Sequence, residues 1–190
     1  GEVMGHYLPA GIRIWGHDMP GTFDEDLALI GGIVGGVTTT GRVICVDPVT
    51  KSQTGLNSIF EGPGAALASN DELMFVAILD QSLYAFKGSD ARVAWRHLTP
   101  SPITEAPVYH EGVLYCSLSD TGLTAFDAQS GKVLWVSEGQ FGEVIGLRNG
   151  RLMVFDGKSL VAVEPQRGVV LDKIDLSNVY DITTSPFVDG

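Results

Sequence analysis

The chain has 190 residues with 12 basic and 23 acidic side chains, which gives a net charge of −11 and a pI of about 4.6. This charge excludes a nucleic-acid-binding role, which needs clustered Lys and Arg to contact phosphates. Hydrophobic residues make up 44% and charged residues 18% of the chain, so it can bury a core and is not disordered.

Glycine is over-represented, with 24 residues against a usual share of about 7%. Many tight turns, and therefore many short strands, explain this excess. The most apolar run, residues 27–37, is far shorter than the roughly 20 residues that a transmembrane helix needs. The sequence therefore predicts no transmembrane segment.

A repeat of about 40 residues runs through the chain. Four apolar tetrapeptides, which begin at residues 43, 83, 123 and 160, align with one another. A second apolar run precedes each of them, and the turn residues between the two runs also recur. Trp15, Trp95 and Trp135 fall on the same register. Four-stranded units of this length are the sequence signature of a β-propeller.

In chain order, residues 1–21 resemble only the closing strands of a unit, and four whole units follow. In the third unit we expect strands at 103–109, 113–118, 123–127 and 132–136. Residues 65–87 lack Gly and Pro and could form a helix, but their repeat partner contains Pro107, Gly112 and Gly122. A helix would not tolerate these residues, so strands are predicted.

The predicted fold is an all-β propeller of four-stranded antiparallel blades. It has about four complete blades and partial blades at both ends, as part of a larger propeller of seven or eight blades. Residues 184–190 match the opening of a unit, so we expect the ring to be completed by a longer chain or by another chain. The predicted boundaries are 1–21, 22–61, 62–101, 102–141, 142–181 and 182–190.

The third unit carries the most specific motif, Ala-Phe-Asp-Ala-Gln-Ser-Gly-Lys-Val-Leu-Trp at residues 125–135. It resembles the repeat of the pyrroloquinoline quinone (PQQ)-like β-propellers, in which the Trp packs between neighbouring blades. An Asp before a turn accepts backbone N–H groups, and Gly supplies a positive φ. The motif is thus interpreted as structural rather than catalytic.

The other units carry degraded copies of this motif. Gly55 stands at the Trp position of the first unit, and Leu171 lies near that position in the fourth. The residues predicted to form the structural motif are Gly11, Trp15, Asp47, Ala85, Trp95, Ala125, Asp127, Ser130, Gly131, Trp135 and Gly168.

No catalytic or metal-binding pattern is found. Cys45 and Cys116 align with small core residues of other units, so both are predicted to be buried. The histidines are predicted to be solvated loop residues, and they are His6, His17, His97 and His110. The acidic loop at 17–26 lacks the spacing of a calcium-binding loop.

The favoured function is a non-catalytic scaffold that binds a protein partner, since some PQQ-like propellers bind partners without a cofactor. The alternative is a dehydrogenase that oxidises alcohols or sugars through PQQ and calcium, and a second alternative is a sensor domain of a larger protein. The resemblance implies a periplasmic or cell-envelope location. Under the favoured hypothesis no cofactor is expected, and self-association through an open blade face is a further possibility.

Overall fold

The computed structural model describes residues 2–7, 9–18, 21–59, 61–63, 67–178 and 187–188, and all of its regular elements are strands. These described residues include no helix that is long and apolar enough to cross a membrane. The strands are β1 (Glu2–Tyr7), β2 (Ile12–Asp18), β3 (Ala28–Ile30), β4 (Ile33–Val37), β5 (Arg42–Asp47), β6 (Ser52–Ser58), β7 (Ala68–Ser69), β8 (Leu73–Ile78), β9 (Ser82–Lys87), β10 (Val93–Leu98), β11 (Val108–His110), β12 (Val113–Leu118), β13 (Gly122–Asp127), β14 (Val133–Glu138), β15 (Glu143–Arg148), β16 (Arg151–Phe155), β17 (Ser159–Val163), β18 (Val170–Asp175) and β19 (Phe187–Val188).

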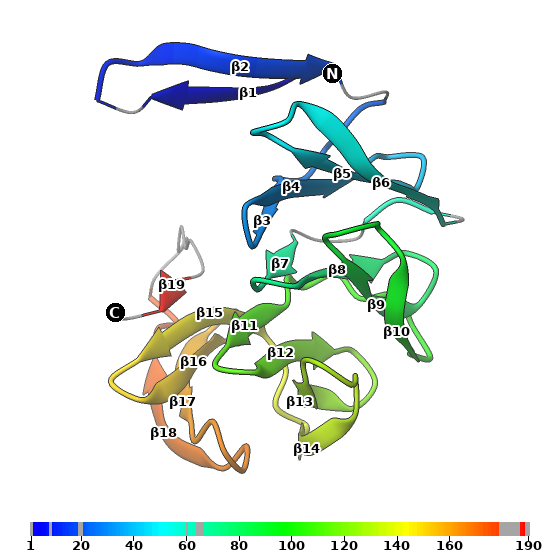
Figure 1. The fold of residues 1–190 in the computed structure, drawn as a ribbon. Coiled ribbons are helices and arrows are strands. Elements are labelled where there is room, and N and C mark those ends of the chain that lie inside the picture. Colours follow the sequence, from blue (N-terminus) through cyan, green and yellow to red (C-terminus); the bar gives the residue numbers. More distant parts are fainter. Residues whose placement is uncertain are drawn as a thin grey trace.

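Four antiparallel sheets form the blades of a propeller, which confirms the predicted fold class. Blade 1 is β3 to β6, blade 2 is β7 to β10, blade 3 is β11 to β14 and blade 4 is β15 to β18, each in sequential order. Figure 1 shows these blades side by side in an open arc, with the β1–β2 hairpin beyond blade 1. At the other end of the arc, β19 pairs in parallel with β15, the first strand of blade 4.

The first strand of blade 3 is shorter than predicted. Strand β11 begins at Val108, whereas a strand was expected from residue 103. Pro107 has no backbone N–H to give to a sheet, which explains the late start. The preceding residues form the linker from blade 2, and Ile103 in this linker is buried in the core between blades 2 and 3.

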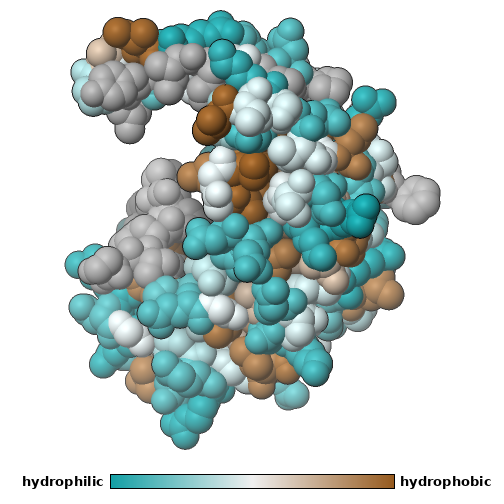
Figure 2. Space-filling view, viewed as in Figure 1, coloured by the Kyte–Doolittle hydropathy of each residue, from teal (hydrophilic) through white to brown (hydrophobic). Residues whose placement is uncertain are grey.

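The two middle strands of a blade are buried on both faces because neighbouring blades cover them. In β8 every residue is buried, and alternate side chains serve different interfaces. Phe75 packs toward blade 3, whereas Met74 and Val76 pack toward blade 1. The outer strand β18 is exposed along its whole length. On the face shown in Figure 2, hydrophilic residues cover most of the surface, with hydrophobic residues between them.

A tryptophan of blade 2 contacts blade 3, and a tryptophan of blade 3 contacts blade 4 in the same way. Trp95 pairs with Ala85 across the strands, and its Nε1–H donates a 2.8 Å hydrogen bond to the carbonyl oxygen of Ala128 in blade 3. Trp135 pairs with Ala125 and donates in the same way, over 2.9 Å, to the carbonyl of Pro165 in blade 4. Each indole therefore docks on the turn before the last strand of the next blade.

A glycine in that turn makes room for the indole. Gly131 has φ +70°, and a Cβ built there would lie 2.6 Å from Cδ2 of Trp95. Gly168 also has φ +70°, and its Cβ would lie 2.4 Å from Cε3 of Trp135. At both positions the backbone and the neighbouring ring exclude a larger residue.

Blades 1 and 4 depart from this pattern. In blade 1, Gly55 is paired with Cys45, and Asn57 donates from Nδ2 to the carbonyl of Ala91 over 2.9 Å, so an amide replaces the indole contact. In blade 4 the residue paired with Ala162 is Asp172, and Leu171 lies in the adjacent bulge. The Trp position of blade 4 is therefore Asp172 rather than Leu171.

We predict that Gly131→Ala lowers the free energy of unfolding by about 2–4 kcal/mol. A residue with a Cβ costs about 1–2 kcal/mol in the left-handed conformation, and the new methyl group would also displace the Trp95 ring. Gly150 is the matched control, since it has φ +69° and nothing lies within 4 Å of its Cβ position. Gly150→Ala should cost only about 1 kcal/mol. Urea unfolding of the two variants measures the difference, and equal losses would contradict the docking of Trp95 on this turn.

Candidate interaction surface

The two ends of the blades are built differently. At one end, which we call the linker end, lie the turns between the second and third strands and the connections between blades. It comprises residues 21–27, 38–41, 61–63, 79–81, 99–107, 119–121, 139–142 and 156–158, together with the strand ends beside them. The opposite end, which we call the turn end, contains only tight connections within blades. The linker end therefore carries the longer irregular segments, which are the usual carriers of binding function.

Charge is unevenly distributed between the two ends. The turn end carries acidic and basic residues in balance, whereas the linker end carries a large excess of acids. The acidic residues at the linker end are Asp24, Glu25, Asp26, Glu61, Asp80, Glu105, Asp120, Glu138, Glu143, Asp156 and Asp175. The basic residues there are Arg42, Arg96, Lys158 and Lys173. Most of the chain's net negative charge is thus placed at one end.

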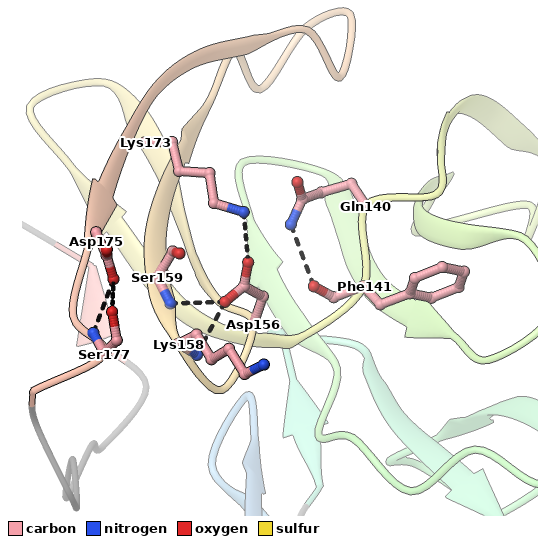
Figure 3. Close-up of polar contacts among 8 residues, drawn as sticks. All are labelled: Gln140, Phe141, Asp156, Lys158, Ser159, Lys173, Asp175 and Ser177. Atoms are coloured by element: carbon pink, nitrogen blue, oxygen red, sulfur yellow. Dashed lines mark hydrogen bonds and ion pairs between the residues drawn. The ribbon is translucent and has the colours of Figure 1, made fainter.

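Two of these carboxylates are neutralised inside their own blade. Asp80 accepts from Arg96 over 3.1 Å and from the hydroxyl of Tyr84 over 3.1 Å. Asp156 accepts from Nζ of Lys173 over 2.8 Å, and its other oxygen accepts the N–H groups of Lys158 and Ser159 (Figure 3). The hydrogen bond from Lys173 and those from the backbone lower the pKa of Asp156. Asp156 thus closes its own turn, whereas Asp80 contacts the strands of its blade through one oxygen, and its Oδ1 is buried without a hydrogen-bond partner among the described residues.

A cavity of about 300 Å³ opens at the linker end where blades 3 and 4 meet. Its walls include Pro102, Thr104, Glu105, Ser117, Ser119 and Phe141. Figure 3 shows that the Phe141 ring points away from the Asp156–Lys173 pair. Phe141 is 43% exposed, so the cavity has an aromatic side chain at its edge.

Glu105 differs from the other polar groups of this cavity. The Ser117 hydroxyl accepts the N–H of Gly142 over 3.2 Å, and the Ser119 hydroxyl is hydrogen-bonded to that of Ser101. Glu105 is half-buried, yet no side chain among the described residues donates to it or forms an ion pair with it. Burial, and then the nearby charge of Glu143, raise the pKa of Glu105. Burial thus disfavours the charged form of this carboxylate, and a positive partner would favour it.

The motif residues predicted from the sequence lie elsewhere. Asp127 closes a turn at the turn end, where Oδ1 accepts from the N–H and the hydroxyl of Ser130 and these bonds lower its pKa. Asp47 caps the corresponding turn of blade 1. The motif does not mark the cavity, and sequence reasoning missed Glu105 and Phe141. The available signal was a Glu inside residues 103–109, which were otherwise expected to form a buried strand.

The remaining candidates have structural surroundings. Cys45 and Cys116 are buried and unpaired, and burial raises their pKa to about 11 and about 12. The histidines were predicted to be solvated loop residues, but all four lie in strands: His6 in β1, His17 in β2, His97 in β10 and His110 in β11. His97 is half-buried, with its ring edge-on to Phe126. Residues 93–98 pair with β9 as a strand, which places His97 in the sheet rather than in a loop. Burial lowers the pKa of His97.

A calcium ion, as the PQQ-dependent alternative requires, needs several oxygen ligands in one place. Within the part of the chain that the structure describes, no three His, Cys, Asp or Glu side chains are grouped so that they could hold a metal ion. The acidic loop contributes the exposed Asp24 and Asp26, whereas Met19 and Pro20 lie outside the described residues.

Comparison with known proteins gives a consistent fold. A family profile described as "Outer membrane protein assembly factor BamB" matches residues 1–190. The crystal structure of BamB from Moraxella catarrhalis is similar with a TM-score of 0.70 and 17% identity, over 92% of this chain and 55% of that one. The chain thus spans about half of that protein. No curated protein sequence matches.

Two further solved structures share the fold. Quinohemoprotein alcohol dehydrogenase from Comamonas testosteroni has a TM-score of 0.62 and 14% identity, over 85% of this chain and 36% of that one. The computationally designed Ika8 protein has a TM-score of 0.55 and 12% identity, over 90% of this chain and 67% of that one. At these identities the likeness concerns the fold alone.

We predict that Glu105→Gln stabilises the chain at pH 7 and that this gain disappears below pH 4. Because the folded-state pKa of Glu105 is raised above the unfolded value of 4.5, its favourable protonated form is complete below that value and is lost as the pH rises through the folded pKa. Gln imitates the protonated form at every pH. Thermal unfolding of both proteins at the two pH values measures this, and an equal effect at both would contradict it.

Proposed function

The chain belongs to the family described as outer membrane protein assembly factor BamB, and we propose that it is a non-catalytic propeller scaffold that binds protein partners in the cell envelope. We further propose that its blades form part of a larger ring of seven or eight, completed by a longer chain or by another chain. The open arc and the pairing of β19 with β15 support this second proposal.

The observation that carries the scaffold proposal is the exposure of large apolar side chains at the acidic linker end. Leu98, at the end of β10, is 66% exposed, and Leu79 and Phe141 are also exposed. These residues lie on rigid blade ends beside irregular linkers, where no packing within the described blades requires them. Exposed apolar side chains with a polar rim are typical of protein-binding surfaces.

A PQQ- and calcium-dependent dehydrogenase is the competing function, and the similarity to the quinohemoprotein concerns only the fold. The two hypotheses are separated by adding PQQ and calcium to the purified chain and following quinone absorbance through gel filtration. We expect no stoichiometric co-migration of quinone with the protein. Retention of one PQQ per chain would refute the scaffold proposal.

The scaffold proposal is tested directly in the organism that carries the gene. Deletion should lower the amount of folded β-barrel protein in the outer membrane, measured by its heat-modifiable migration on gels, and the wild-type gene should restore it. Phe141→Asp should fail to restore it because a charge replaces an apolar contact. Leu134→Asp is the control, since Leu134 is equally apolar and exposed but lies toward the turn end of β14. Deletion without any effect would contradict the proposal.

A further inference from the structure

We infer that the cavity between blades 3 and 4 at the linker end receives a Lys or Arg side chain from a segment of the protein partner. This inference deepens the proposed function and rests on it. It assigns a partner chemistry to a cavity lined by Glu105, Phe141, Thr104, Ser117 and Ser119.

Two hydroxyls of the cavity have hydrogen-bond partners, whereas the half-buried Glu105 and the exposed Thr104 have none among the described residues. The hydroxyls of Ser117 and Ser119 are engaged with Gly142 and Ser101. The half-buried carboxylate of Glu105 has no donor among the described residues, and the side chains that line the cavity include no basic one. A cationic donor is the group that would satisfy this carboxylate, because charge-assisted hydrogen bonds are the strong ones.

Two neighbours increase the preference for a cation. Glu143 lies close enough for its charge to act on Glu105. Phe141 presents an exposed aromatic ring at the edge of the same cavity. A guanidinium or ammonium group near an aromatic ring gains a cation–π interaction in addition to the ion pair. The site thus offers both contacts that a Lys or Arg side chain uses.

The surroundings favour a protein segment over a free small cation. The linker that supplies Pro102, Thr104 and Glu105 starts directly after Leu98, which is 66% exposed. An apolar residue of the partner can pack against such an exposed side chain while a nearby basic residue of the partner enters the cavity. A single carboxylate with engaged hydroxyls is a poor site for a calcium ion, which takes six to eight oxygen ligands.

The test uses the purified chain and two fluorescein-labelled peptides that alternate Leu with either Arg or citrulline, the neutral analogue of Arg. Fluorescence anisotropy should show that the Arg peptide binds at least tenfold more tightly than the citrulline peptide. Glu105→Gln should weaken binding of the Arg peptide about tenfold, as loss of a partly buried charge pair predicts. Phe141→Leu, which keeps an apolar side chain but removes the ring, should weaken it a few-fold.

Glu111→Gln is the matched control. It removes the same charge from the same blade, but Glu111 is 85% exposed and lies at the turn end, so the affinity should stay unchanged. Equal losses in the Glu105 and Glu111 variants would show that only net charge attracts the peptide, and this would overturn the inference. Equal binding of the two peptides, absence of binding, or displacement of the Arg peptide by calcium at constant ionic strength would also overturn it.

These outcomes are distinct from a failure of the scaffold function. If Glu105→Gln binds the Arg peptide normally while deletion of the gene still lowers the folded β-barrel protein, the partner chemistry is wrong and the scaffold function stands. If deletion has no effect while the Glu105 variant loses the peptide, the cavity binds a cationic segment but outer-membrane assembly is not its purpose. Circular dichroism of each variant verifies its fold.

Discussion

The docking of an indole from one blade on a turn of the next is the contact on which the arrangement of blades 2, 3 and 4 depends. Trp95 and Trp135 each fill the space beside a left-handed glycine and donate one hydrogen bond to a carbonyl of the next blade. A buried aromatic side chain contributes several kcal/mol through its area alone, and the hydrogen bond fixes its orientation. These contacts hold the turn end of each of these blades against the next blade.

Polar groups at the two ends of the blades have different surroundings. At the turn end, Asp127 accepts hydrogen bonds from the hydroxyl and the N–H of Ser130, and Asp47 accepts from backbone N–H groups and from Thr50, and these bonds lower the pKa of both carboxylates. At the linker end the connections are longer and irregular, so side chains such as Glu105 are positioned by blade packing without being consumed by a turn. The conspicuous sequence motif therefore marks the turn end, whereas the cavity lies at the linker end.

The fold was predictable from the sequence because the apolar residues that pack between blades recur about every 40 residues. The tetrapeptides 83–86 and 123–126 lie within β9 and β13, and residues 113–118 form β12 as expected. One strand differs from the prediction for a physical reason, since Pro107 delays the start of β11. The cavity was not predictable, because it joins residues from two linkers and the end of β12, and only blade packing brings these together.

The charged groups of the linker end differ in their expected effect on a basic partner, both at long range and in direct contact. Exposed acids such as Asp24 and Asp120 are screened within about 10 Å at ordinary salt, so they raise the rate at which a basic partner arrives but add little specificity. Asp80 and Asp156 are neutralised by Arg96 and Lys173 and contribute still less. Glu105 alone in the cavity combines partial burial, a raised pKa and no donor among the described residues. Partial burial of this charge costs stability, and a cation bound beside it would offset that cost.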